Sequence, residues 1–389
     1  MSAQQAAAEQ ALPRARSAPW VVLSYLAIGL AAALPRVLNL GVFLSGDESQ
    51  FWIHRSAVFL QALRTRDWAA TAISTHPGVT TMWLGSAGML LRRALTDWGW
   101  LQDQSFPTLL AVLRMPTALV HVAAILLGYA LLRRMLAPAA AALAALLWAL
   151  DPFVVAFSRV LHVDALAGTF MTLSALAACL YWHHQRRARW LILSGVAAGL
   201  ALLSKSPGLA LIPWVGLVAL LAQRSNVRSF ERSNVSGAWS FVVPLLAWGA
   251  VAAITVFALW PALWVSPLDA FRQIQIGVEA EGAQPHMMGN FFLGRQDDSP
   301  GALFYPVALA LRLTPWTLLG LLLLAPAWWR RRALERRDLA ALACLALIVV
   351  AALTLFPKKF NRYVEPIFPA LDIMAAVGLV GILDFGFWI

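Results

Sequence analysis

Three lysines in this chain have types and positions that could hold a phosphate. They are Lys205, Lys358 and Lys359, and they are the only lysines among 30 basic residues. Each lies in a short linker beside a long apolar run. An ammonium group is a compact point charge that suits phosphate, so lysines gathered beside apolar segments favour an anionic ligand at a membrane surface.

Two acids and a histidine add groups that could move or hold a proton. Gly46-Asp47-Glu48 follows the first apolar run by about ten residues. Adjacent acids can act as a general base with an orienting partner, hold a cation, or simply be solvated. Arg159, His162 and Asp164 occupy one short turn between apolar segments. Charge inside such segments is usually paired or functional, and a local ion pair between two helices would explain the turn equally well.

The sequence around the lysines also bears on anion binding. Lys205 precedes Ser206 and Pro207, and proline suits the first turn of a helix. The N-terminus of that helix would add N–H donors and a dipole that favours an anion. Lys358, Lys359 and Arg362 gather at the end of another apolar run. Snorkelling to lipid head groups would explain any one of these residues, but together they suggest transfer of a group from a lipid phosphate.

The elements that must position these residues are predicted to be membrane helices. Of 389 residues, 60% are hydrophobic and 13% are charged, whereas soluble domains carry roughly a quarter charged residues. Recurring apolar runs of about twenty residues predict an all-α polytopic membrane protein. About ten spans (9–11) are expected, near 20–34, 108–132, 138–157, 164–182, 190–204, 207–222, 240–262, 302–327, 339–356 and 366–386.

Arginine placement predicts the orientation. If the short segment 79–91 lies in the interface, five short linkers on the N-terminal side carry fifteen arginines, and the opposite side carries twelve basic residues. This positive-inside pattern predicts a cell (inner) membrane protein with a cytoplasmic tail, 1–19, and a single catalytic domain, 20–389. Loops 41–107 and 264–301 would face the outer, periplasmic side, the first with two or three surface helices. All three lysines would then lie on the outer face.

Several classes of site are not expected. The net charge of +11 falls mostly in short loops between spans, so no nucleic-acid partner is predicted. Cys179 and Cys344 both lie inside apolar spans and support neither a disulfide framework nor a zinc site. Surface acids could hold Mg²⁺ or Mn²⁺, but no dense ligand set is present, so no cofactor is assigned.

The ordered set of motifs resembles the integral-membrane GT-C glycosyltransferases that take sugars from polyprenyl phosphates. Protein O-mannosyltransferases and the aminoarabinose transferases of lipid A are the nearest look-alikes. Each motif alone is weak, but the ordered set covers about residues 20–385. The matching pieces are Gly46-Asp-Glu48, the turn from Arg159 to Asp164, Lys205-Ser-Pro207, His286 with Asn290-Phe-Phe-Leu-Gly294 in the second outward loop, and Lys358-Lys-Phe-Asn-Arg-Tyr-Val-Glu-Pro366.

The resemblance implies transfer of a monosaccharide from an undecaprenyl-type phosphate to a hydroxyl or phosphate on a protein, lipid or glycan acceptor. Asp47 would deprotonate or orient the acceptor, and attack at the anomeric carbon would invert it in one displacement. Glu48, His162 and Asp164 would orient or bind the acceptor. The residues implied to bind the lipid phosphate are Lys205, Lys358, Lys359, Arg362 and Arg159.

Two departures from the family pattern affect these expectations. Aminoarabinose transferases carry a lysine next to a proline in the first loop, where this chain has Thr75-His76-Pro77. His76 would replace that lysine at the phosphate, so the sugar or acceptor is expected to differ. The chain ends at Ile389 without a polar tail, so the C-terminal extension of many relatives is expected to be absent.

Two other functions fit the same pattern. A transporter or flippase of polyprenyl-linked sugars would share the cationic cavity but need a path to the cytoplasm, and a catalytically dead scaffold would tolerate loss of the lysines. The surface helices of the first loop and Asp47 favour an enzyme.

Overall fold

The structure is a computed structural model that describes residues 18–227, 236–282, 284–285 and 287–386. Residues 1–17 of the predicted tail and His286 of the second loop lie outside the described residues. The helices are α2 Ala18–Val37, α3 Ile53–Thr65, α4 Val79–Asp97, α5 Phe106–Leu132, α6 Pro138–Leu150, α7 Pro152–Ser158, α8 Asp164–Cys179, α9 Ala188–Ser204, α10 Leu211–Val227, α11 Ser236–Leu259, α12 Ala262–Val265, α13 Pro267–Gly282, α14 Phe304–Arg312, α15 Pro315–Trp328, α16 Ala333–Leu355 and α17 Phe368–Gly386. Short π- or 3₁₀-helical segments are η1 Glu48–Trp52, η2 Ala69–Thr71, η3 Leu180–His184, η4 Ser206–Ala210 and η5 Asn361–Ile367, and a small antiparallel hairpin joins β1 Asn290–Phe292 to β2 Arg295–Asp297.

The predicted membrane spans all coincide with helices. Within the described residues, seven helices are long and apolar enough to cross a membrane, or nine if each of two bent pairs counts as one span. The shorter apolar helix α9 occupies the remaining predicted position. The chain is therefore a multi-pass membrane protein, and the prediction of about ten spans is not contradicted. Helix α4, predicted to lie in the interface, is not among the candidate spans in the described part of the chain.

Both bent pairs break at a proline. Helices α14 and α15 meet at 112°, and α6 and α7 meet at 57°. Pro315 and Pro152 stand at the first turn of the second helix in each pair, where the missing N–H costs nothing and the preceding residue is held in an extended conformation. Asp151 caps α7 by accepting from the backbone N–H groups of Phe153 and Val154 at 2.8 and 2.9 Å. Hydropathy alone does not reveal these bends.

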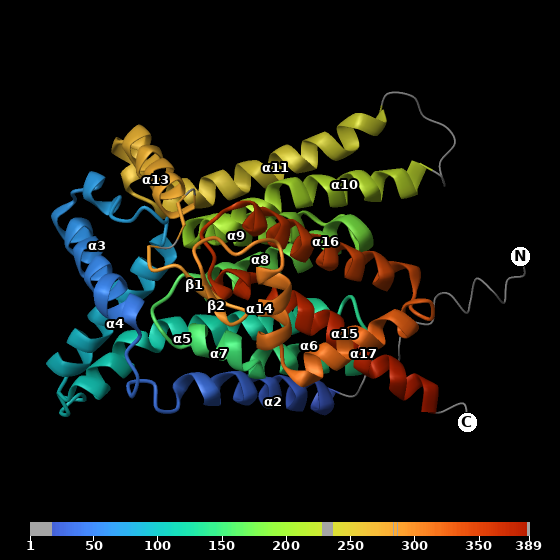
Figure 1. The fold of residues 1–389 in the computed structure, drawn as a ribbon, viewed down its shortest axis with the longest axis horizontal. Coiled ribbons are helices and arrows are strands. Elements are labelled where there is room, and N and C mark those ends of the chain that lie inside the picture. Colours follow the sequence, from blue (N-terminus) through green and yellow to red (C-terminus); the bar gives the residue numbers. More distant parts are fainter. Residues whose placement is uncertain (1–17, 228–235, 283, 286, 387–389) are drawn as a thin grey trace, which may run out of the picture.

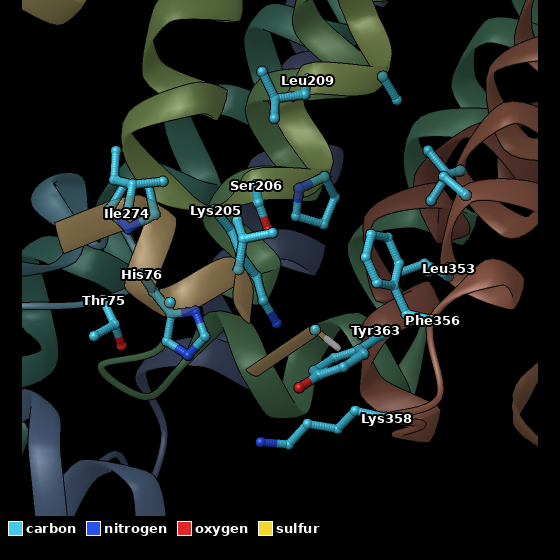
Figure 2. A pocket seen from close by; sticks show the side chains of 18 of the residues that line it. Thr75, His76, Lys205, Ser206, Leu209, Ile274, Leu353, Phe356, Lys358 and Tyr363 are labelled. Atoms are coloured by element: carbon cyan, nitrogen blue, oxygen red, sulfur yellow. The ribbon is translucent and has the colours of Figure 1, made fainter. Parts of the chain in front are cut away.

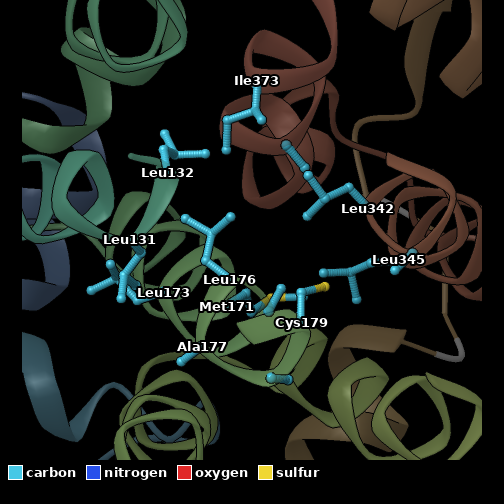
Figure 3. Close-up of a cluster of buried hydrophobic side chains, with 14 of the residues drawn as sticks. Leu131, Leu132, Met171, Leu173, Leu176, Ala177, Cys179, Leu342, Leu345 and Ile373 are labelled. Atoms are coloured by element: carbon cyan, nitrogen blue, oxygen red, sulfur yellow. The ribbon is translucent and has the colours of Figure 1, made fainter. Parts of the chain in front are cut away.

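Helix α8 forms the centre of the bundle. All sixteen of its residues are buried, and it packs against α5, α9, α10 and η5. Figure 3 shows apolar side chains of α5, α8, α16 and α17 meeting around it. Since α8 begins at Asp164, the most buried helix of the protein carries a carboxylate at its first residue.

Helices α15 and α17 approach unusually closely through glycine. A Cβ atom at Gly378 would lie 1.9 Å from the carbonyl oxygen of Gly320. Small residues at such crossings let membrane helices pack backbone to backbone, where no hydrophobic effect drives helices together. This contact anchors α17, which follows the lysine-bearing segment directly.

The loops separate into two ends of the bundle. Figure 1 places α3, α4 and α13 together at the left end, whereas the start of α2, the end of α10 and the end of α17 lie at the right. Loops 41–107 and 264–301 therefore share one end, opposite the start of α2. Leu26 and Leu30 of α2 and Leu246 of α11 are among the exposed apolar side chains between the two ends, as expected for a lipid-facing surface.

Candidate functional site

The structure brings Asp47, His162 and Arg362 together from three distant parts of the chain. Asp47 Oδ2 lies 2.9 Å from His162 Nε2 and 3.1 Å from an Arg362 Nη atom. Asp47 belongs to the loop after α2, His162 to the turn before α8 and Arg362 to η5. Asp47 contacts both His162 and Arg362 through the same oxygen, Oδ2.

Asp164 extends this network to Lys205. Its Oδ1 pairs with Lys205 Nζ, and its Oδ2 lies 3.2 Å from His162 Nδ1 and 3.7 Å from Arg362 Nε. Asp164 is fully buried. Breaking a buried pair by removing one partner is strongly destabilising, so Asp164 fixes Lys205, His162 and Arg362 relative to one another.

Local backbone structure directs Lys205 toward this network. Helix α9 ends at Ser204, and Lys205 takes an extended conformation before η4. Ser204 is tied to the first loop, since its carbonyl accepts from Gly78 N at 3.1 Å and its hydroxyl lies 2.7 Å from Thr80 Oγ1. These two hydrogen bonds therefore join the first loop to the end of α9, next to Lys205.

Glu48 faces away from this network and holds Arg114. Glu48 Oε1 accepts from Arg114 Nε at 2.8 Å and from Leu161 N at 2.9 Å, and Oε2 lies 2.5 Å from an Arg114 Nη atom. The guanidinium also donates to the carbonyls of Leu40 and Phe43 at 2.5 Å. Glu48 and Arg114 thus clamp the loop that carries Asp47 against the turn that carries His162.

Asp47 is kept ionised by its neighbours. The hydrogen bond with His162 has the largest effect, and the charges of Arg362 and Lys205 add to it; together they outweigh partial burial and lower the pKa of Asp47 to about 2. A carboxylate of such low basicity is a weak proton acceptor but a good hydrogen-bond acceptor. Asp47 is therefore suited to orienting a hydroxyl group.

Two cavities meet at this network. A polar cavity of about 300 Å³ is lined by residues that include Asp47, Arg55, His162 and Arg362. A mostly apolar groove of about 410 Å³ runs between α10, α13 and α16. The residues that line both are Thr75, His76, Lys205, Lys358 and Tyr363.

The groove has polar side chains at one end and apolar side chains at the other. In Figure 2, His76, Lys205, Tyr363 and Lys358 surround the lower part of the space, and Leu209, Ile274, Leu353 and Phe356 line the upper part. Lys205 Nζ lies 4.2 Å from the centre of the Tyr363 ring, within cation–π range. A ligand with an anionic head and an apolar chain would fit this arrangement.

Three residues predicted for the site lie elsewhere. Lys359 donates through Nζ to the carbonyls of Leu353, Thr354 and Phe356 at 3.0, 2.7 and 2.5 Å, so it caps the C-terminus of α16. Arg159 donates to the carbonyls of Leu38 and Asn39 at 2.5 and 2.9 Å. Asn290 is the first residue of β1. None of these lines either cavity, and His286 is outside the described residues.

Sequence reasoning missed Arg114 and Tyr363. Arg114 was hidden as a single charge inside the span 108–132, although charge within a span is itself a signal of a buried partner. Tyr363 stands in the quoted motif that begins at Lys358, but an aromatic residue there gave no reason to expect contact with Lys205. The partners of Arg114 and Tyr363 are evident only from the folded structure.

Asp47, Glu48 and Asp164 are each paired with basic side chains among the described residues. Divalent ions need several oxygen ligands that converge on one point, and in the described part of the chain these three carboxylates do not form such a cluster.

Comparisons with known proteins identify this fold. The sequence profile of the dolichyl-phosphate-mannose-protein mannosyltransferase family matches residues 106–260. The structure is similar to ArnT from Cupriavidus metallidurans bound to undecaprenyl phosphate, with a TM-score of 0.62 and 19% identity over 94% of this chain and 61% of ArnT. It is also similar to the oligosaccharyltransferase of Archaeoglobus fulgidus, with a TM-score of 0.56 and 18% identity over 95% of this chain and 51% of that one.

The chain thus spans about half to three fifths of the length of these solved structures. A sequence comparison with curated proteins gives no match. The resemblance seen in the sequence motifs is nevertheless confirmed by the profile match and by the fold. The protein has the GT-C fold that these solved structures share.

Proposed function

We propose that this protein is a membrane glycosyltransferase that moves a monosaccharide from a polyprenyl phosphate to an acceptor hydroxyl or phosphate. The observation that carries the proposal is the wall shared by the apolar groove and the polar cavity, which bears Lys205, Lys358 and His76. The polyprenyl chain would lie in the groove, its phosphate against this wall, and its sugar in the polar cavity beside Asp47.

Each charged residue then has a role in a single displacement. The acceptor oxygen, held by Asp47, attacks the anomeric carbon while the bond from that carbon to the phosphate oxygen breaks. The electron pair of that bond passes to the phosphate, whose growing charge Lys205, Lys358 and Arg362 stabilise. The proton of an acceptor hydroxyl passes to the departing phosphate or to water, while Asp47 holds the acceptor oxygen as a hydrogen-bond acceptor. The anomeric configuration inverts.

The remaining residues position these groups. Glu48 and Arg114 hold the loop of Asp47, and Asp164 holds Lys205 and His162. His162 supports Asp47 at 2.9 Å. Holding reactants in a near-attack geometry supplies much of the rate of such reactions, which explains why the acids around Asp47 are buried and paired.

The proposed site faces the outer side of the cell (inner) membrane, with the N-terminus in the cytoplasm. The arginine distribution supports this orientation. The position of loops 41–107 and 264–301 at the end opposite the start of α2 is compatible with it (Figure 1).

A transfer assay on the purified protein tests the function. A panel of polyprenyl-phosphate sugars would be supplied with candidate acceptor fractions, and glycosylated products identified by mass spectrometry. Asp47→Asn should lower transfer by about 100-fold or more and leave binding of polyprenyl phosphate largely intact. Asp97→Asn is the matched control, because Asp97 lies in the same region, 41–107, but is exposed and paired with the exposed Arg93. Full turnover in Asp47→Asn would sink the assignment, and export of the intact donor without transfer would indicate a transporter.

A further inference from the structure

A second cluster of chemically capable side chains lies far from the proposed site. Cys179, at the end of α8, lies near His183 of η3 and Asp338 of α16, and one ligand atom from each lies within 4.8 Å of the others. All three side chains are buried or nearly so. The 21 residues from Asp164 to His184 correspond to roughly 30 Å of helix, so this cluster is separate from the polar cavity.

Local helix geometry builds the cluster. The α8 helix widens to a π-helical turn over η3, where Gln185 N donates to Leu180 O at 2.7 Å. π-turns inside helices are rare and often mark functional sites. Here the turn presents two consecutive histidines to one carboxylate: His183 Nδ1 lies 2.7 Å from Asp338 Oδ1, and His184 Nε2 lies 2.7 Å from Asp338 Oδ2.

The ligand types suit zinc. Thiolate, imidazole and carboxylate are its usual protein ligands, with bonds of about 2.3 Å to sulfur and about 2.0–2.2 Å to nitrogen and oxygen. Cys179 and His183 are four residues apart, a spacing that places two side chains on one face of a helix. Around a tetrahedral ion the ligand atoms would lie roughly 3.3–3.7 Å apart, so the widest separation, within 4.8 Å, would contract by about 1 Å and the 2.7 Å between His183 Nδ1 and Asp338 Oδ1 would open.

Charge balance also favours an ion at this buried place. A thiolate and a carboxylate together neutralise a divalent cation, so the loaded site would carry no net charge. Without an ion, the Asp338 carboxylate is buried with two imidazoles, and the Cys179 thiol adds nothing to that pair. A His–Asp–His bridge explains the histidines, but it does not explain a fully buried cysteine beside the carboxylate.

We propose that Cys179, His183 and Asp338 bind a zinc ion that joins α8 to α16. Binding would release the thiol proton of Cys179, and His183 would carry its proton on Nε2 so that Nδ1 binds the metal. His184 would orient Asp338 through its existing hydrogen bond. A water molecule can fill the fourth tetrahedral position. The two cysteines alone did not indicate zinc, because the partners of Cys179 in the fold are a histidine and a carboxylate.

The zinc content of the purified full-length protein, freed of any affinity tag and measured by plasma mass spectrometry, tests the proposal. The unmodified protein and Cys344→Ser should each retain about one zinc per chain, whereas Cys179→Ser and Asp338→Asn should retain at least tenfold less. Cys344 is the matched control, since it is the other cysteine and does not belong to the cluster. Equal zinc in all four proteins, or none in the unmodified one, would overturn the proposal.

Cobalt gives a second readout that needs no folded variant of Asp338. Cobalt bound to the unmodified protein should show the near-ultraviolet absorption of a thiolate ligand, and Cys179→Ser should lack it. A chelator should lower the melting temperature of the unmodified protein and Cys344→Ser but not that of Cys179→Ser. Cobalt binding without a thiolate band would contradict the assignment.

Discussion

Two adjacent lysines in this protein have different environments. Lys358 lines both the groove and the polar cavity, whereas Lys359 is 2% exposed and donates three hydrogen bonds to the end of α16. Charged donors near a helix C-terminus satisfy carbonyls that have no partner within the helix. The same residue type thus faces a cavity at one position and supports the fold at the next.

Replacing each lysine by methionine should separate these roles. Lys359→Met should destabilise the protein by about 1–3 kcal/mol, because three partly buried carbonyls lose a charged donor. Lys358→Met should lower the melting temperature less than Lys359→Met, because Lys358 is only partly buried, and should raise the KM for the polyprenyl-phosphate donor by about tenfold. Thermal unfolding in detergent and donor titrations measure both quantities. The reverse pattern, with Lys359 controlling KM, would return Lys359 to the phosphate site.

The ionisation of Asp47 makes a prediction about pH. Its folded-state pKa, about 2, lies below the ordinary value of 3.8, so the carboxylate is charged at every pH above about 4 and loses its charge only as the pH falls toward 2. Its titration should therefore leave kcat/KM unchanged between about pH 4 and 9. His162→Phe removes the largest cause of the low pKa, so the acid limb of that variant should move to higher pH.

His54→Phe is the control for the effect of His162→Phe. His54 is an exposed histidine of α3, in the loop 41–107 that also carries Asp47. Its pH profile should match that of the unmodified protein. An acid limb that stays in place in His162→Phe would show that Asp47 does not depend on His162.

At the scale of elements, the close packing of the first loop against the bundle depends on Gly78. Gly78 has a φ of +57°, and a Cβ atom there would lie 2.4 Å from the Trp52 ring. Its N–H donates to Ser204 O, the residue before Lys205. The short segment from His76 to Gly78 therefore sets the distance between η1, α4 and the end of α9.

Gly78→Ala should disturb the site more than the same substitution at another glycine with a similar backbone conformation. The substitution adds both backbone strain and overlap with Trp52, and overpacking typically costs about 1–3 kcal/mol. Gly99→Ala is the control: Gly99 has a φ of +72°, but nothing lies within 4 Å of its Cβ position, so it tests strain alone. Melting temperature and donor KM should change more for Gly78→Ala. Equal effects would show that contact with Trp52 is unimportant.

At the scale of the whole molecule, the sequence predicted the bundle well because hydropathy is a property of long segments. All ten expected spans contain helices. Asp164 and Lys205 were singled out as charges beside apolar runs, and they pair with each other in the fold. The clamp of Glu48 by Arg114, the capping by Lys359 and the bend before Pro315 were not foreseen. Each depends on which side chains meet across the fold, and spacing along the chain does not carry that information.

The orientation of the molecule can be measured with engineered cysteines. Gln102→Cys lies in the loop predicted to face outward, and Arg337→Cys lies in an arginine-rich segment predicted to face the cytoplasm; both positions are exposed. In a Cys344→Ser background, a membrane-impermeant maleimide should label Gln102→Cys in intact cells and Arg337→Cys only after permeabilisation. The opposite labelling would place the polar cavity on the cytoplasmic face.

The wall shared by groove and cavity has a consequence for turnover. If a polyprenyl phosphate binds there, the spent carrier keeps the chain that fills the groove and the phosphate that faces Lys205 and Lys358, and it loses only the sugar. Its phosphate monoester also carries more negative charge than the sugar-bearing diester did. The spent lipid should therefore compete with fresh donor for the site and act as a product inhibitor. Where the polyprenyl phosphate accumulates in the bilayer, the rate of turnover is then set by how fast this product is removed.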